Sequence, residues 1–408
     1  MYTEATFVTP TGMDAATSDR AQKLLSLEEQ VVRLQALLEA SRQVHSILSV
    51  EDVLEQTAQV LVRELEIEGA VFLAPETGRV MASYGTPDGS AAADGGTRFP
   101  LLSRDGRTLA ELVVSAGGEG ELSLYEQDFI EGLALQAAVA LENATYHERD
   151  LQWARVQQDL DAARNIQRSL LPKSMPAIEG FSIDGRSTTC YEVGGDYMDT
   201  LLLPDGSRLF IVADVAGKGL ASAIMAMSFR STFRSLATQP LALVDVVNRV
   251  GQQHWEEGTE ARRRYVTAIF LRLRADGDEI EFVNAGHNPA LLVMPDGTVK
   301  MVEASGTPLG MLPGMQYAAE TVAFPAGARV LLYTDGLTEV FRGEEEFGCE
   351  RLAELFRDAD PTHAGRILEM IWERLDSYSI HAPQTDDMTA IAVCHLAHLV
   401  HRQENARP

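Results

Sequence analysis

Hydrophobic positions along the chain change their spacing several times, and each change predicts a different element. Residues 1–20 are small and polar, and we expect them to be poorly ordered. From residue 21, leucine and valine recur at alternating spacings of three and four, as in a short a/d seam. This spacing fits a surface helix packed on its own domain or a coiled-coil dimer. A second helix is expected after Ser49, a good N-cap with Glu51 and Asp52 in the first turn.

Between residues 68 and 115 the period shortens to that of β-strands separated by turns. Asp105-Gly106 is a good hairpin signal, and a long helix is expected to begin near residues 122–126. Two helices, a small antiparallel sheet and a closing helix make an α+β module. Their order resembles a GAF sensory domain over about residues 40–146, with a PAS domain as the nearest alternative. The module contains no cysteine, which excludes a bilin attached through a thioether.

The stretch from residue 142 to residue 171 contains neither proline nor glycine, which predicts one continuous helix that ends before Pro172. Trp153 and Val156 belong to an a/d-like stripe, in which Gln167 is a polar interruption that can set register and oligomeric state. Two interpretations stay open. The helix is either a passive spacer or a signalling helix that joins two protomers and carries a change from sensor to output, and we favour the second.

The remainder of the chain mixes strand-like runs with two separate blocks of helix. Turns such as Pro204-Asp205-Gly206 join the runs, which predicts antiparallel sheets covered by helices from outside, a layered α-β-β-α sandwich. We therefore expect an α+β protein of several parts. These are a disordered N-terminus (1–20), a GAF-like domain with a leading helix (21–146), a helical linker (147–172), the sandwich domain (173–396) and a C-terminal tail (397–408).

Four aspartates in the sandwich region share one setting, because each lies at the end of an apolar run or beside glycines. They are Asp196, Asp214, Asp335 and Asp386. One such aspartate is more often a turn residue or a helix cap, but strand ends on one rim of a sheet converge. Carboxylates brought together have raised pKa values unless cations neutralise them. Oxygen ligands without His or Cys favour Mg²⁺ or Mn²⁺ over Zn²⁺, and two such ions can activate a hydroxide for attack on phosphorus.

Several motifs follow one another in this region. They are ARNIQRSLLP (163–172), EVGGD (192–196), DVAGKG (214–219), NAGHNP (284–289), TPLG (307–310), YTDGLTE (333–339), FG (347–348) and DDMT (386–389). Together they resemble the bacterial SpoIIE/RsbU-type branch of the metal-dependent PPM (protein phosphatase 2C-like) serine/threonine phosphatases. The resemblance implies that Asp196, Asp214, Asp335 and Asp386 are catalytic and bind two Mn²⁺ or Mg²⁺ ions. It also implies the backbone carbonyl of Val215 as a further ligand.

The sequence departs from the eukaryotic members of that family at one place. They carry a histidine just after the second aspartate motif, where this chain has Val215-Ala216, so the general acid stays unassigned. We expect His287 to have a structural role in a turn and Asp387 to support the ligands without binding an ion itself. Lys218 stands between glycines, but the residues around it do not complete a phosphate-binding P-loop.

Composition narrows the range of partners and locations. The net charge of −26 disfavours nucleic acid and anionic membrane surfaces as partners. The three cysteines form no CxxC motif, which suits a reducing compartment. The first residues do not have the pattern of a signal peptide, and we find no apolar run of membrane-spanning length. We therefore expect a cytoplasmic protein.

The predicted function is that of a sensor-regulated phosphoserine/phosphothreonine phosphatase, a homodimer through its helical segments. The resemblance implies a phosphorylated STAS-domain anti-sigma-factor antagonist as substrate. One alternative is a nucleotide cyclase, because Gly194-Gly195-Asp196 is similar to the GGDEF signature of diguanylate cyclases, although Tyr197-Met198 replaces its Glu-Phe. A second alternative is a catalytically silent signalling scaffold.

Overall fold

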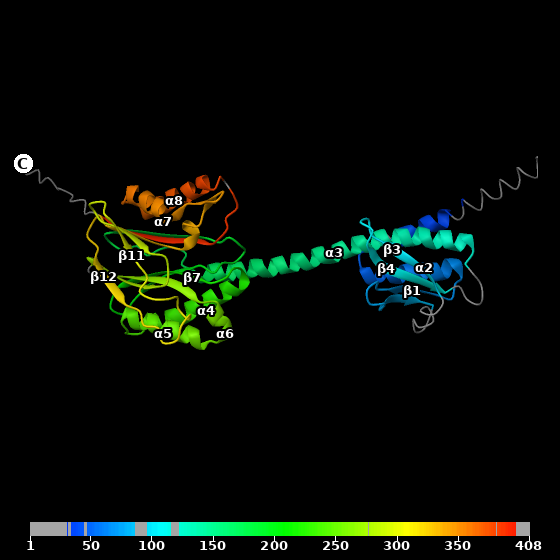
Figure 1. Ribbon diagram of the computed structural model, residues 1–408, viewed down its shortest axis with the longest axis horizontal. Coiled ribbons are helices and arrows are strands. Elements are labelled where there is room, and N and C mark those ends of the chain that lie inside the picture. The colour runs from blue at the N-terminus through cyan, green and yellow to red at the C-terminus, as the bar shows by residue number, and fades with distance from the viewer. Residues whose placement is uncertain are drawn as a thin grey trace, which may run out of the picture. The chain divides into compact units, whose positions relative to one another are not determined.

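A computed structural model describes residues 31, 34–44, 47–85, 96–115, 122–275, 277–380 and 382–396. Several predicted segments lie outside these residues, among them the N-terminus (1–20), most of the first seam and the tail (397–408). The chain divides into two compact units, Met1–Val156 and Gln157–Pro408. Helix α3 (Leu124–Leu170) runs through the boundary without a break (Figure 1).

Helix α3 confirms the predicted long helix at both of its ends. The Ser123 hydroxyl accepts a hydrogen bond from the Glu126 backbone N–H at 3.3 Å, and the Glu126 carboxylate accepts one from the Ser123 N–H at 2.7 Å. This reciprocal pair is a capping box, which satisfies two backbone donors at the start of the helix. The helix ends at Leu170, two residues before Pro172.

The N-terminal unit is an antiparallel sheet covered by helices. Its described strands have the order β2-β1-β4-β3, with bounds β1 (Gly69–Leu73), β2 (Val80–Tyr84), β3 (Thr97–Leu102) and β4 (Thr108–Ser115). Helix α2 (Val50–Leu65) begins after Ser49, whose hydroxyl accepts from the Asp52 N–H as predicted. Residues 34–44, α2 and the first part of α3 share one apolar core with the sheet. The α+β module is confirmed, and its assignment as a GAF domain stays a prediction.

The C-terminal unit contains two larger sheets. The described strands of the first have the order β12-β9-β8-β7-β6, with bounds β6 (Tyr197–Leu202), β7 (Arg208–Val215), β8 (Val266–Leu273), β9 (Glu279–Ala285) and β12 (Ala319–Ala323). Those of the second have the order β11-β10-β13-β16-β5, with bounds β5 (Phe181–Thr188), β10 (Ala290–Val293), β11 (Val299–Val302), β13 (Arg329–Tyr333) and β16 (Met388–His395). The paired strands of both sheets are antiparallel, as predicted.

Helices cover the outer face of each sheet, which makes the predicted α-β-β-α layers (Figure 1). The bounds are α4 (Leu220–Ala237), α5 (Leu243–Glu256) and α6 (Thr259–Arg263) beside the first sheet, and α7 (Gly348–Asp358) and α8 (Ala364–Tyr378) beside the second. Successive side chains of β7 point to opposite faces of the sheet, which explains why the layers form on both sides of it. Ile211 and Ala213 pack toward α4 and α5, whereas Phe210 and Val212 pack between the sheets with Leu332 of β13. Both faces of the strand are therefore buried.

Several short features of this unit were not predicted, among them α6, β11, β12 and the hairpin of β14 (Phe341–Arg342) with β15 (Glu345–Glu346). Strand β12 lies at a sheet edge and most of its residues are exposed, so its sequence lacks the alternation that reveals a half-buried strand. Among the described residues, no helix has the length and apolar character needed to cross a bilayer.

Candidate metal centre

The register of the sheets brings the four predicted aspartates to one rim. In the first sheet Tyr197 pairs with Ala213, so Asp196 and Asp214, the next residues outward, lie side by side. In the second sheet Tyr333 pairs with Ala390. The chain leaves β13 at Tyr333 and enters β16 at Met388, so the segments that carry Asp335 and Asp386 meet at that edge.

Burial and mutual repulsion raise the pKa values of three of these carboxyls. Asp196 is 4% exposed, and burial followed by the charge of Asp214 raises its pKa well above the usual range. Burial, Asp335 and Asp386 raise the pKa of Asp214 to about 7. Burial and Asp386 raise the pKa of Asp335. A cluster of carboxyls that resist ionisation is a favourable place for cations, because a cation restores the charged form.

Glycines let the segments of this rim come close together. A Cβ added to Gly195 would lie 2.9 Å from the carbonyl oxygen of Val215 and 3.4 Å from a carboxylate oxygen of Asp214. A Cβ on Gly336 would collide with the backbone carbonyl of Asp387. The atoms nearest to the added Cβ atoms are protein atoms, so these glycines allow strand ends to pack closely on one another.

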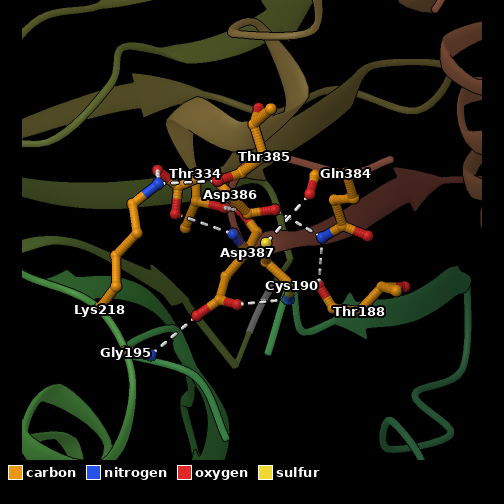
Figure 2. A network of polar contacts seen from close by, with 9 residues as sticks. All are labelled: Thr188, Cys190, Gly195, Lys218, Thr334, Gln384, Thr385, Asp386 and Asp387. Atoms are coloured by element: carbon orange, nitrogen blue, oxygen red, sulfur yellow. Dashed lines mark hydrogen bonds and ion pairs between the residues drawn. The ribbon is translucent and has the colours of Figure 1, made fainter. Parts of the chain in front are cut away.

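Two further residues hold the aspartates in place. The Asp387 carboxylate accepts hydrogen bonds from the backbone N–H groups of Cys190 at 2.7 Å and Gly195 at 2.8 Å (Figure 2). The hydroxyl of the buried Thr334 donates to Asp196 at 2.8 Å and accepts from the Thr389 N–H at 3.0 Å. Asp387 thus has the supporting position expected for it. The role of Thr334 was missed, although its place between a strand and Asp335 was a usable signal.

Gln167 has a different role from the one inferred for it. Its side-chain amide donates to the Gly194 carbonyl at 2.7 Å, and its amide oxygen accepts from the Gly194 N–H at 3.3 Å. The side chain is buried, and nearby Arg164 donates to the Glu192 carbonyl at 2.7 Å. Gln167 is therefore not a polar position in a dimer seam. It ties the end of α3 to the loop that leads into Asp196.

Lys218 lies at the same rim. Its ammonium group is 2.8 Å from the carboxylate of Asp386 and donates to the Thr385 carbonyl at 2.7 Å (Figure 2). Across the part of the chain that the structure describes, no three His, Cys, Asp or Glu side chains stand as a ready set of metal ligands. The chemistry of the rim nevertheless fits hard cations, since its carboxylates repel one another and the Val215 carbonyl faces Gly195 beside Asp214.

His287 has the structural surroundings that were expected for it. Its backbone N–H donates to the Asn284 side chain at 2.9 Å, and its Nδ1 lies 2.8 Å from the Thr267 hydroxyl. Burial lowers the pKa of His287 to about 4, so the ring is neutral near pH 7. A buried, neutral imidazole in a turn is poorly placed to protonate a leaving group.

A groove of about 410 Å³ begins at the rim, where Gly336 and Asp386 form part of its wall. Its other walls include Val340 and Phe341 from the β14 region, Leu375 from α8 and Pro383 from the segment between α8 and β16. Phe341 is exposed, so the groove offers an apolar surface beside a cluster of charges.

Comparisons with known proteins show what the C-terminal part of the chain is similar to. Residues 204–396 match the family model of Stage II sporulation protein E (SpoIIE). Phosphoserine phosphatase RsbP of Bacillus subtilis is 30% identical over 183 residues, which cover 44% of this chain and 45% of RsbP. Phosphoserine phosphatase RsbU of the same organism is 25% identical over 247 residues, which cover 58% of this chain and 70% of RsbU.

A solved structure shows the same fold. The SiaA-PP2C domain of Pseudomonas aeruginosa aligns with a TM-score of 0.51 and 23% identity, over 59% of this chain and 97% of that domain. Residues 204–396 are therefore similar to SpoIIE-type domains, and the C-terminal unit has the fold of a PP2C domain. The chain spans less than half the length of RsbP.

Proposed function

We propose that the protein is a metal-dependent phosphoserine/phosphothreonine phosphatase. The observation that carries the proposal is the convergence of four aspartates from separate strand ends on one rim, where burial and neighbouring carboxylates raise the pKa values of Asp196, Asp214 and Asp335. Asp196, Asp214, Asp335, Asp386 and the Val215 carbonyl would hold two Mn²⁺ or Mg²⁺ ions. When bound, such ions would supply an activated water at neutral pH and neutralise charge on the phosphate.

The residues around the aspartates set their positions. Thr334 fixes the carboxylate of Asp196 by hydrogen bonding, and Asp387 fixes the backbone of the loop that precedes it. Preorganised groups of this kind lower the barrier because they need no rearrangement when charge develops. The general acid stays unassigned.

The groove beside the rim supports a phosphoprotein substrate over a small phosphate ester. A polypeptide whose phosphoserine reaches Asp386 could place its neighbouring residues against Phe341 and Val340, and such remote contacts help to position the reacting phosphate. The resemblance to SpoIIE/RsbU-type proteins extends the proposal to a phosphorylated STAS-domain anti-sigma-factor antagonist in the cytoplasm. Its dephosphorylation would release a sigma factor through partner switching.

One assay separates the three classes of function. Full-length protein is incubated in Mn²⁺, and in parallel in EDTA, with a phosphoserine-containing STAS protein, with p-nitrophenyl phosphate and with GTP. We expect Mn²⁺-dependent release of phosphate from the phosphoprotein, slower hydrolysis of the aryl phosphate and no cyclic dinucleotide. Formation of cyclic dinucleotide would identify a cyclase. If no phosphoserine protein is hydrolysed and no cyclic dinucleotide forms, the remaining hypothesis is the catalytically silent scaffold.

We also propose that the N-terminal unit is a GAF-like sensor that controls the phosphatase through α3. The end of α3 is hydrogen-bonded through Arg164 and Gln167 to the loop before Asp196. A movement of the helix would therefore shift this loop and the position of Asp196. A homodimer would cover apolar side chains that are exposed on α3 and on residues 34–44, such as Trp153, which is 70% exposed.

A proline tests this control without touching the contacts at the rim. Gln157 donates to the Glu192 side chain at 3.1 Å, so the substitution belongs before it, at the exposed Gln152. Gln152→Pro removes a helical hydrogen bond and costs about 3 kcal/mol or more. We expect Mn²⁺-dependent turnover that no longer differs between full-length protein and a chain starting at residue 157, and less dimer by light scattering. Gln152→Ala is the control. A Gln152→Pro protein with wild-type dimer content and regulation would show that α3 is only a spacer.

A further inference from the structure

The loop after β7 is shaped so that a lysine reaches the second sheet. Lys218 stands between Gly217 and Gly219, whose φ angles of 102° and 77° lie in the region that side chains rarely adopt. Glycine occupies this region at little cost, so the loop can turn sharply before α4. Figure 2 shows the Lys218 side chain extended to Thr385 and Asp386, which belong to the segment that enters β16.

The Lys218 ammonium group contacts two groups of one segment. It lies 2.8 Å from the Asp386 carboxylate and donates a hydrogen bond to the Thr385 carbonyl at 2.7 Å. Lys218 therefore places a positive charge directly at a carboxylate of the rim.

The Lys218–Asp386 pair is also accessible. The two side chains are 49% and 31% exposed, so water and dissolved ions can reach the carboxylate. An exposed ion pair is individually weak and can exchange its partner at modest cost. A divalent ion at the Asp386 carboxylate would have to take a place next to, or in place of, the ammonium group, and two cations at one carboxylate repel each other.

We propose that Lys218 is a tethered counter-cation of the metal centre, which must leave Asp386 before a divalent ion binds that carboxylate. This inference rests on the proposed function. It follows that ion binding at Asp386 is weakened by the lysine, whereas the Asp196 carboxylate accepts its hydrogen bond from the neutral hydroxyl of Thr334. The two ions should therefore bind with different affinities, and the lysine should be a reason for the difference.

Isothermal titration calorimetry with Mn²⁺ on the metal-stripped full-length chain tests the proposal. We expect Lys218→Met to bind the weaker ion about three- to tenfold more tightly than wild type, the range expected for release of a partly exposed pair. The gain should shrink as salt is added, because screening weakens the competing charge. Lys218→Arg keeps the cation and should stay near wild type. Lys300→Met removes an exposed lysine on β11 and should change nothing.

Thermal melting in EDTA gives a second reading that does not depend on activity. We expect Lys218→Met to melt at a lower temperature than wild type, because the carboxylates lose their counter-cation, and Mn²⁺ should remove that difference. If a folded Lys218→Met protein binds Mn²⁺ no more tightly than wild type does, the inference about Lys218 is wrong, whereas the proposed metal centre is not contradicted. If neither wild type nor any variant binds Mn²⁺, the metal centre itself is wrong and this inference fails with it.

Discussion

The two units of the chain use buried polar side chains in different ways. Among the described residues of the N-terminal unit, the buried polar side chains are Thr57 and Ser103. Thr57 donates to the Val53 carbonyl one turn earlier in its own helix at 2.6 Å, and Ser103 bonds within a turn. In the C-terminal unit, buried polar side chains join separate strands, as Thr334 does when it bonds to Asp196.

This difference separates the residues that build a fold from those that build a site. Burying a polar group costs free energy unless its hydrogen bonds are replaced. In the N-terminal unit, the buried hydroxyls make these hydrogen bonds within their own helix or turn. Removing the hydroxyls would therefore cost little stability. The C-terminal unit instead gathers carboxylates whose charges oppose one another, an arrangement that packing alone does not require. Buried polar groups that join distant segments are therefore the better guide to function.

The largest expected effect compares two buried aspartates that are three residues apart. Asp196 belongs to the cluster, whereas Asp199 forms an ion pair with Arg234 at 2.5 Å. Asp196→Asn should lower turnover by about 10³-fold, since stabilisation by a metal ion is worth several kcal/mol, without lowering the melting temperature in EDTA. Asp199→Asn should do the reverse, with near-normal turnover and a stability loss of about 1–3 kcal/mol. Phosphoprotein kinetics and thermal melting measure both. Normal turnover in Asp196→Asn would refute the metal assignment.

A matched pair of threonines gives the next largest effect. Thr334 and Thr57 are both fully buried, and valine keeps the shape of each while removing its hydroxyl. Thr334→Val should lower kcat by about 10- to 100-fold, because the support of a metal ligand is lost. Thr57→Val should leave kcat unchanged and alter stability by about 1 kcal/mol. Equal effects of the two changes on kcat would contradict the contrast between the units.

The groove predicts a smaller, substrate-dependent effect. Phe341→Ala should lower kcat/KM for the phosphoprotein about tenfold, as expected when an apolar contact of 1–2 kcal/mol is lost. Hydrolysis of p-nitrophenyl phosphate, which is too small to reach along the groove, should change less than about twofold. Leu202→Ala removes another exposed apolar side chain of the same unit and serves as the control. Equal losses on both substrates would assign Phe341 to the stability of the rim and not to recognition.

The smallest expected effect is a dependence of stability on pH. Because the pKa of Asp214 is raised to about 7 from an ordinary value of 3.8, protonated Asp214 stabilises the folded chain below pH 4. That contribution is lost as pH rises through about 7. In EDTA, the melting temperature of wild type should therefore fall relative to that of Asp214→Asn between pH 5 and pH 8. Each kcal/mol of unfolding free energy that is lost should lower the melting temperature by about 2–4 °C. Saturating Mn²⁺ should abolish the relative slope. Parallel curves in EDTA would show that Asp214 is not perturbed.

The sequence predicted the parts of the fold that are long and periodic. The long helix α3, both outer helix blocks and the main strands of the sandwich were found, because their apolar positions repeat with a helical or strand period. The edge strands β11 and β12 were missed, since an edge with few buried residues leaves little pattern. The assignment of the N-terminal unit as GAF-like rested on the order of elements alone, which several sensory folds share.

The candidate site was predictable only in part. Aspartates at strand ends are visible in the sequence because the flanking apolar runs are visible. The partners of those aspartates are not, since Thr334 and Gln167 act through contacts between segments that are far apart in the chain. Gln167 even appeared to belong to a helical seam, because its spacing matches the stripe. The register between strands decides which residues lie opposite one another, and it is known only from the folded structure.

The pairing of β5 with β16 has a consequence for how the protein is made. Ser187 and Thr389 share a hydrogen bond at 2.8 Å although 202 residues separate them, and Asp386 lies just before the same last strand. Contacts between residues so far apart in the chain form late, because the entropy cost of closing a long loop comes before the contacts contribute any stability. During synthesis, the N-terminal unit can fold while the ribosome is still translating the sandwich. The second sheet must wait for its final strand, so a truncated or half-translated chain cannot complete the rim until translation has passed residue 395.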